Sequence, residues 1–389
     1  MVLDASQVEN SAADSAIDES LIAAMRIALI TTVQHNPGDD FVRDGIKYLI
    51  RRLLPHADIH FENIHKHAPI TARYGFAKKR KLDGLDRLLP LRVTRDRILE
   101  SDLVIQCGAP VYWCHARVNA HCCDNEWFEP LIRRRLSRNH KAAFLNIAGG
   151  SCQLYHSDGS EICDRCLDYI KLLYDAARVT TLRDDLARTI LSRTPAPALA
   201  PVIPCPSLFA VDEYNITPQV GEFIVLNFMQ LAGHYSFAQS IDRDRWKTVL
   251  TRFYNEIRLN APVIFACHDR LEIEWARSID SEATIFYSTR AADYIKFYAR
   301  AQFGIVNRLH AAYALASLGK PSLVIGNDSR SCMADLIETE RLYVNDVTVD
   351  ALVDYFDRLA VRASHFGDRI RQIKREALAG YLDSMAIIQ

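Results

Sequence analysis

Three side chains that can bind an anion stand together after an apolar run. Phe303-Gly-Ile-Val306 predicts a strand, and Asn307, Arg308 and His310 follow it at the start of a small-residue stretch that predicts a helix. Ligands of open α/β sheets bind at the carboxyl ends of strands, where the N-terminal amides of the next helix carry partial positive charge. Arginine adds a planar donor fork suited to carboxylate or phosphate, and histidine adds a donor that can carry a proton. The spacing therefore predicts an anion site.

A structural role is the alternative for the two cationic residues of this segment. Arg308 would then form a salt bridge, and His310 would cap the helix. Their position together at a strand end favours the anion site.

The cysteines are a second group of residues with chemistry of their own. Eight of the ten lie between Cys107 and Cys205. Cys163 and Cys166 have the C-x-x-C spacing that lets two thiolates reach one metal ion. With Cys152, at the end of a predicted strand, and one further ligand, the pair predicts a zinc ion or an iron–sulfur cluster. The alternative is that these cysteines are small core residues.

A basic segment spans residues 73–97, with nine Lys or Arg against three Asp. It follows the second predicted strand, which places it near a cleft edge. There it predicts a loop that receives an anionic acceptor, such as a phosphorylated or diphosphate-linked sugar. The alternative is a solvated surface loop.

Short apolar runs that alternate with amphipathic stretches must position these residues. In the first half, the predicted strands are Arg26–Val33, Asp58–Ile64, Leu103–Cys107, Ala142–Ala148, Val179–Leu182 and Val202–Pro204, with a helix at Phe41–Leu54. In the second half, they are Phe223–Phe228, Val263–Cys267, Ala283–Tyr287, Phe303–Val306 and Ser322–Ile325, with helices at Asp242–Leu259, Ala291–Arg300 and Ala311–Leu318. Continuous apolar strands are typical of parallel sheets that helices cover on both faces.

Two consecutive βα series predict an α/β fold with two Rossmann-like, doubly wound domains facing a cleft. Prolines punctuate the chain between 195 and 218, and no regular element can run through them. We therefore expect an N-terminal domain over residues 25–210, rich in cysteine, and a C-terminal domain over residues 211–363. A final helix over residues 364–389 is expected to pack back on the N-terminal domain.

The overall charge excludes a global field for nucleic acid or an anionic membrane. Among 389 residues, Lys plus Arg is 47 and Asp plus Glu is 48, for a net charge of −1.

No apolar run reaches the roughly 18 residues that a membrane span needs. Residues 1–24 are polar and acidic, without the basic start and apolar core of a secretory signal. We expect this segment to be a mobile tail and the protein to be cytoplasmic.

Three segments, in the right order, resemble the polysaccharide pyruvyl transferase family. The first is Asn36-Pro-Gly-Asp-Asp40 after the first strand, similar to the family's Asn-x-Gly-Asp. The second is Thr181-Leu-Arg-Asp184, and the third is Arg308-Leu-His310 followed by a small-residue helix and Gly319-Lys-Pro321. The chain departs from the family at Gly108-Ala-Pro110, where a Gly-Gly pair is frequent, and at Cys205-Pro206, where Asp-Pro is frequent.

The resemblance implies a fold similar to the GT-B arrangement and an enzyme of polysaccharide biosynthesis. The family transfers an enolpyruvyl unit from phosphoenolpyruvate to a sugar or glycan-like acceptor, usually as a cyclic ketal, and needs no cofactor. By this resemblance the donor ligands are Arg308, His310, Arg183 and Asn307, and the residues lining the cleft from the other domain are Asn36, Gly38 and Asp39.

Ketal formation needs an acid that protonates the methylene carbon and a base for the acceptor hydroxyl. His310 is the candidate acid because the unperturbed pKa of histidine lies near neutrality. Asp39 or Asp40 is the candidate base. The alternative for Asp39 is to cap the helix predicted from Phe41.

Two other functions share the predicted fold. A GT-B glycosyltransferase using a nucleotide sugar would need an acidic ribose partner, for which Glu272 and Glu274 are candidates. A metal- or redox-dependent binding protein is the non-enzymatic alternative, and its support is the cysteine content alone.

Overall fold

The computed structural model describes residues 24–32, 36–65, 96–114, 128–195, 198–229 and 241–388. The acidic tail, except its last residue, therefore lies outside the described residues, and so does the basic segment up to residue 95.

The first half of the chain forms a parallel sheet in the order β2-β1-β3-β5-β4, with β6 also paired to β5. The strands are β1 (Met25–Thr31), β2 (Ile59–His65), β3 (Leu103–Cys107), β4 (Pro110–Tyr112), β5 (Ala143–Ser151) and β6 (Val179–Leu182). The helices around it include α1 (Pro37–Leu53), α3 (Asp164–Ala176) and α4 (Asp185–Ser192), with a short α2 (Arg134–Leu136). The central strand β3 is buried along its whole length, which explains why four of its five residues are apolar. The exception, Gln106, donates a hydrogen bond to the Asn146 Oδ1 at 3.0 Å.

The segment rich in proline contains less strand than the sequence predicts. Val202 makes one isolated bridge to Leu182, in place of the predicted strand Val202–Pro204. Pro201 and Pro204 lack the N–H donors that a longer ladder needs. A 3-10 turn (Pro206–Phe209) and the short helix α5 (Ala210–Glu213) then lead to the second half.

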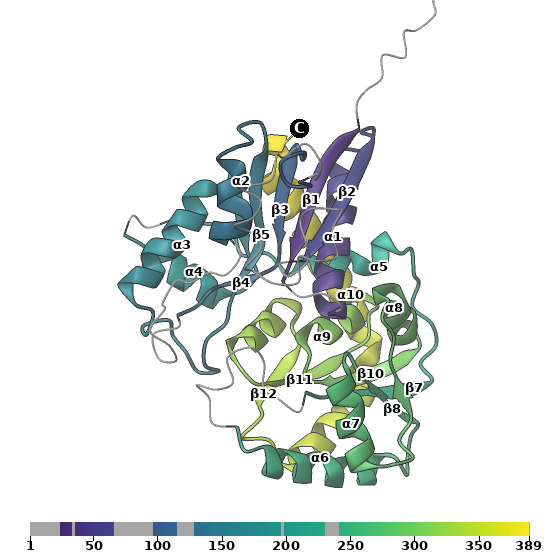
Figure 1. The fold of residues 1–389 in the computed structure, drawn as a ribbon. Coiled ribbons are helices and arrows are strands. Elements are labelled where there is room, and N and C mark those ends of the chain that lie inside the picture. The colour runs from purple at the N-terminus through teal and green to yellow at the C-terminus, as the bar shows by residue number, and fades with distance from the viewer. Residues whose placement is uncertain are drawn as a thin grey trace, which may run out of the picture.

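The second half forms another parallel sheet, in the order β12-β11-β10-β7-β8-β9. Its strands are β7 (Phe223–Asn227), β8 (Val263–Ala266), β9 (Ile285–Phe286), β10 (Ala301–Val306), β11 (Ser322–Gly326) and β12 (Glu340–Tyr343). The helices that cover it include α6 (Arg243–Ile257), α7 (Arg270–Ile279), α8 (Ala291–Ala299) and α9 (Leu309–Ser317). Figure 1 shows the two sheets in separate lobes, with α1 and α9 between them.

The last helix, α10, joins the two lobes (Figure 1). It runs from Val349 to Met385, so the predicted start near Ser364 is wrong by about four turns. Its first part buries Leu352 and Leu359 in the core of the second sheet, and this packing extends the helix toward its N-terminus. Its last part, with Tyr381, packs in the core of the first sheet. The predicted boundary between residues 363 and 364 therefore falls inside one continuous element.

None of the helices in the described ranges is long and apolar enough to cross a membrane.

Candidate active site between the two sheets

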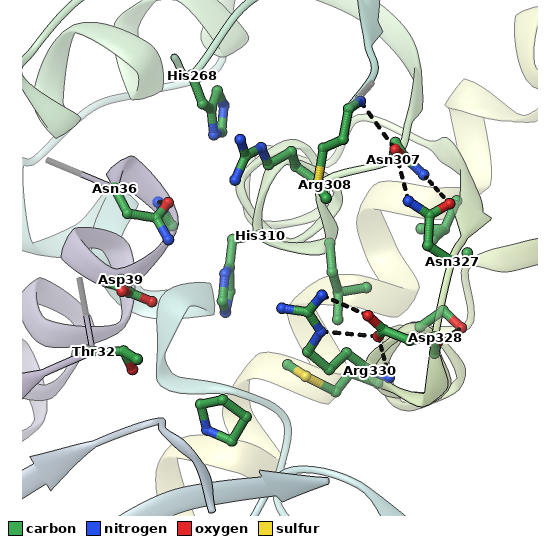
Figure 2. A pocket seen from close by; sticks show the side chains of 18 of the residues that line it. Thr32, Asn36, Asp39, His268, Asn307, Arg308, His310, Asn327, Asp328 and Arg330 are labelled. Carbon is green, nitrogen blue, oxygen red and sulfur yellow. Dashed lines mark hydrogen bonds and ion pairs between the residues drawn. The ribbon is translucent and has the colours of Figure 1, made fainter. Parts of the chain in front are cut away.

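A cavity of about 360 Å³ lies where the carboxyl ends of both sheets meet. Its lining residues are Thr32, Asn36, Gly38, Asp39, Pro110, Arg183, Met229, His268, Asp269, Asn307, Arg308, Leu309, His310, Val324, Gly326, Asn327, Asp328, Arg330, Ser331 and Met333. Figure 2 shows Asn36 and Asp39 on one side of it, facing His310 and Arg308. Residues about 270 positions apart in the chain thus share one cavity, which is the convergence that the two-domain prediction requires.

The N-terminus of α1 forms the wall from the first domain. Asn36 is its N-cap, and the Asn36 side chain accepts a hydrogen bond from the Gly38 amide at 3.2 Å. The helix therefore begins at Pro37, not at the predicted Phe41, because proline suits the first helical turn. Asp39 lies in that first turn and lines the cavity, so it is not the cap.

Asp40, the other candidate base, does not line the cavity. Its carboxylate is paired with the Arg43 guanidinium, one turn along the same helix. Arg43 also binds Asp44, at 3.0 Å from its Nε. The structure therefore places Asp40 in an ion-pair network behind the cavity wall.

Arg183 lines the cavity with a buried guanidinium that lies beside Gly150 of β5. The side chain is 2% exposed, and its Nε and one terminal nitrogen have no hydrogen-bond partner among the described residues. An alanine Cβ at Gly150 would stand 2.3 Å from the Arg183 Nε, so the glycine makes room for the guanidinium. A buried guanidinium without partners is costly, and such groups in native proteins call for an explanation such as an absent anion.

A local distortion of β5 creates this room. The β5–β6 register shifts between Asn146 and Gly149, and Ala148 has φ of 56°, a left-handed value that is rare outside glycine. The Ala148 amide donates to the Thr181 hydroxyl at 2.8 Å, which holds the distortion in place. Bulges of this kind re-aim the chain beside functional sites.

Arg308 forms a salt bridge, as the structural alternative predicted, while also lining the cavity. Its guanidinium contacts Asp269 at 2.7 Å and Glu272 at 2.6 Å. Its side chain is 21% exposed, so most of it is covered by the surrounding protein. Glu272 is buried, and burial raises the pKa of its carboxyl although the Arg308 charge acts in the opposite direction. Two carboxylates thus offset much of the Arg308 charge and fix its orientation.

His310 projects from the first turn of α9 and packs between the two domains. An alanine Cβ at Gly38 would stand 2.6 Å from the His310 Nδ1, so α1 approaches the ring closely. On the other side, the His310 Nε2 lies 3.9 Å from the Cys205 Sγ. Burial and three neighbouring arginines hold the pKa of His310 well below 6.5, so the ring is neutral without a ligand. The N-cap of α9 is Arg308, so His310 does not cap the helix.

Asn307 braces the strand ends beside the cavity. Its Oδ1 accepts a hydrogen bond from the Met229 amide at 3.0 Å, and its Nδ2 donates to the carbonyl of Ile325. The Nδ2 also donates to the Asn327 Oδ1 at 3.0 Å (Figure 2). These contacts give the predicted donor ligand a positioning role.

Among the cavity residues that were not predicted from the sequence, two have basic side chains, His268 and Arg330. His268 follows β8, and its buried Nδ1 has no hydrogen-bond partner among the described residues, while its Nε2 lies 3.0 Å from the Tyr298 hydroxyl. Arg330 follows β11 and is paired with Asp328 at 2.6 Å. Both lie just past predicted strands of the sheet that carries Arg308, so the same strand-end rule would have found them.

The predicted cysteine site is only partly assembled. Cys163 and Cys166 lie close together, and the sulfur that joins them belongs to Cys114, not to Cys152. Cys152 is 1% exposed, and burial raises the pKa of its thiol, which disfavours a thiolate there.

The fold and the cavity together describe an α/β protein of two sheet lobes with a cavity between them. The sequence profile of the family described as polysaccharide pyruvyl transferase matches residues 36–329. The chain therefore belongs to the polysaccharide pyruvyl transferase family, and it is a transferase.

Solved structures with the same fold are distant in sequence. The Staphylococcus aureus MnaA–UDP co-structure has a TM-score of 0.53 at 13% identity, covering 90% of this chain and 94% of that one. A putative UDP-N-acetylglucosamine 2-epimerase from Listeria monocytogenes has a TM-score of 0.52 at 11% identity, covering 90% and 91%. At this identity the likeness establishes the GT-B fold alone. Comparison with curated proteins gives no match.

Proposed function

We propose that this enzyme transfers the enolpyruvyl unit of phosphoenolpyruvate to hydroxyls of a sugar or glycan-like acceptor. The observation that carries the proposal is the buried guanidinium of Arg183, in a cavity shared with Arg308 and His310. Two of its nitrogens have no hydrogen-bond partner within the part of the chain that the structure describes. The family supplies the reaction class, and the cavity supplies a site for a small anion.

The charges of the cavity suit a donor that carries both phosphate and carboxylate. Arg183 contributes a cation that no described carboxylate pairs, whereas Arg308 and Arg330 are pre-oriented by acidic partners. Arginine forks bind such groups through paired, charge-assisted hydrogen bonds. Held in place before the donor arrives, they stabilise the phosphate as it leaves without reorganising.

The donor itself prepares His310 as an acid. Arginine charges and burial keep the ring neutral in the free protein, which revises the expectation of an unperturbed pKa. A phosphate and a carboxylate beside the ring oppose those charges and raise its pKa, so a proton is taken up as the donor binds.

The proton that His310 takes up on donor binding is the one that the first step of the proposed reaction uses. His310 gives it to the methylene carbon, which becomes a methyl group, and positive charge develops on the carbon that bears the phosphate oxygen. An acceptor hydroxyl attacks that carbon and loses its proton to Asp39, across the cavity. The bond from carbon to phosphate oxygen breaks, and phosphate leaves with the proton that Asp39 had taken, which returns Asp39 to its carboxylate form. A second hydroxyl attacks the same carbon to close the ketal, and its proton returns to His310.

A nucleotide-sugar donor has less support in this cavity. Of the two acidic candidates for a ribose partner, Glu272 is buried against Arg308 and Glu274 is exposed, and neither lines the cavity.

Phosphate release from phosphoenolpyruvate, measured against a panel of sugar acceptors in D2O, tests the proposal. We expect release that depends on the acceptor, and a product whose methyl group carries one deuterium per transfer. Acceptor-dependent release without deuterium in the methyl group would rule out protonation of the methylene carbon. Turnover of a nucleotide sugar, with none of phosphoenolpyruvate, would show that the donor is a nucleotide sugar.

A further inference from the structure

Three thiols converge at the edge of the first domain, away from the cavity lining. The sulfur atoms of Cys114, Cys163 and Cys166 all lie within 4.8 Å of one another. Thiolates on a tetrahedral zinc ion, at about 2.3 Å from the metal, are about 3.8 Å apart. The observed grouping therefore needs shifts of about 1 Å or less to bind one ion. We propose that these cysteines hold a single thiolate-preferring metal ion, with Zn²⁺ as the expected occupant.

Two of the three ligands are placed by the start of α3. Cys163 is the N-cap of this helix, and the amide of Cys166 donates to the Cys163 carbonyl at 2.9 Å. This turn brings the two thiols to the same side of the helix end. The partial positive charge at a helix N-terminus also favours thiolate over thiol at such positions.

The third ligand comes from another part of the fold. Cys114 lies two residues past the end of β4, more than 40 positions before α3 in the chain. An ion bound by all three would join the segment after β4 to α3. Because Pro110 of β4 lines the cavity, the ion would brace one edge of the active site without touching the reaction.

The burial of the group suits a structural ion. Cys166 is 2% exposed and belongs to the core formed by the sheet, α3 and α4, while Cys114 and Cys163 are half-buried against that core. Three thiolates leave one position of a tetrahedral ion for a further ligand. The other buried cysteines, Cys107 and Cys152 among them, do not join the group, so clustering is not a general result of the cysteine content.

Elemental analysis of the full chain, purified with reductant and without chelator, tests the proposal. We expect about one zinc per chain, lost in Cys163→Ser and Cys166→Ser and retained in Cys332→Ser, a half-buried cysteine outside the group. Metal-free protein, retention of zinc in both variants, or iron with acid-labile sulfide would each overturn the single-ion site.

A second measurement uses the unmodified protein, in case the variants fail to fold. Thiol labelling followed by peptide mass spectrometry should show Cys114, Cys163 and Cys166 protected until a strong chelator is added, then labelled together. Labelling that does not change with chelator, or a disulfide between two of these residues, would contradict metal binding. Neither measurement depends on the proposed donor, so the two proposals can fail separately.

Discussion

Replacing Arg183 by methionine should stabilise the free protein while removing donor binding. Two buried Arg183 nitrogens have no partner in the described ranges of the chain, and each such group costs about 1–3 kcal/mol. An apolar side chain of similar length removes that cost, so we expect the free energy of unfolding to rise by about 1–4 kcal/mol. Two charge-assisted hydrogen bonds to the ligand, at about 1.5–3 kcal/mol each, imply a Kd for phosphoenolpyruvate at least about 100-fold higher.

Arg43→Met is the matched control for this substitution. Arg43 is also largely buried, but it pairs with Asp40 and Asp44 behind the cavity wall. Its loss removes the Arg43 pairing of the Asp40 carboxylate, while Asp44 keeps its ion pair with Lys47. We expect destabilisation by about 3–5 kcal/mol. Denaturant unfolding of both variants, with and without phosphoenolpyruvate, distinguishes a guanidinium that binds the donor from one that stabilises the fold. If Arg183→Met destabilised the protein as Arg43→Met does, or bound the donor like the parent, Arg183 would have a structural role and would not be a donor ligand.

Three further substitutions follow from the geometry. Arg308→Ala should lower the free energy of unfolding by about 3–5 kcal/mol because it leaves the buried Glu272 carboxylate without its ion pair. Adding Glu272→Gln should recover part of this loss, as measured by denaturant unfolding. Equal stabilities of the single and double variants would argue against the pairing. Burial, with the charge of Arg308, holds the pKa of His268 well below 6.5 in the folded state. The unfolded state therefore binds more protons, and stability is lost as pH falls below about 6.5. His268→Gln should reduce that loss by up to about 1.4 kcal/mol per pH unit, and an unchanged slope would assign the pH dependence to other groups. Gly38→Ala, whose Cβ would stand 2.6 Å from the His310 Nδ1, should lower kcat by about tenfold or more; normal turnover would show that the ring position is not critical.

The sequence predicted most strands because their signals are local, but it missed β4 and β12. Leu103–Cys107 and Val179–Leu182 have the predicted bounds, since short runs rich in apolar and β-branched residues favour a buried strand. Helix ends were less accurate. The start of α1 depended on the Asn36 cap, and the start of α10 depended on which core its first turns meet.

The site shows the same division between local and long-range information. The strand-end rule indicated Arg308 and His310, but it could not reveal that Asp269 and Glu272, nearly 40 positions earlier, pair with Arg308. Likewise, spacing identified Cys163 and Cys166, while the sulfur that joins them depends on how β4 packs beside α3. Partners that arise from tertiary packing carry no periodic signal in the sequence.

Isothermal titration calorimetry of the full chain with phosphoenolpyruvate, and separately with UDP, is the most direct test of the central claim. We expect saturable binding of one phosphoenolpyruvate per chain, accompanied by proton uptake that is seen as a dependence of the enthalpy on buffer ionisation. Arg183→Met should abolish this binding, and UDP should bind far more weakly. Tight binding of UDP, with no heat from phosphoenolpyruvate, would contradict the proposed donor.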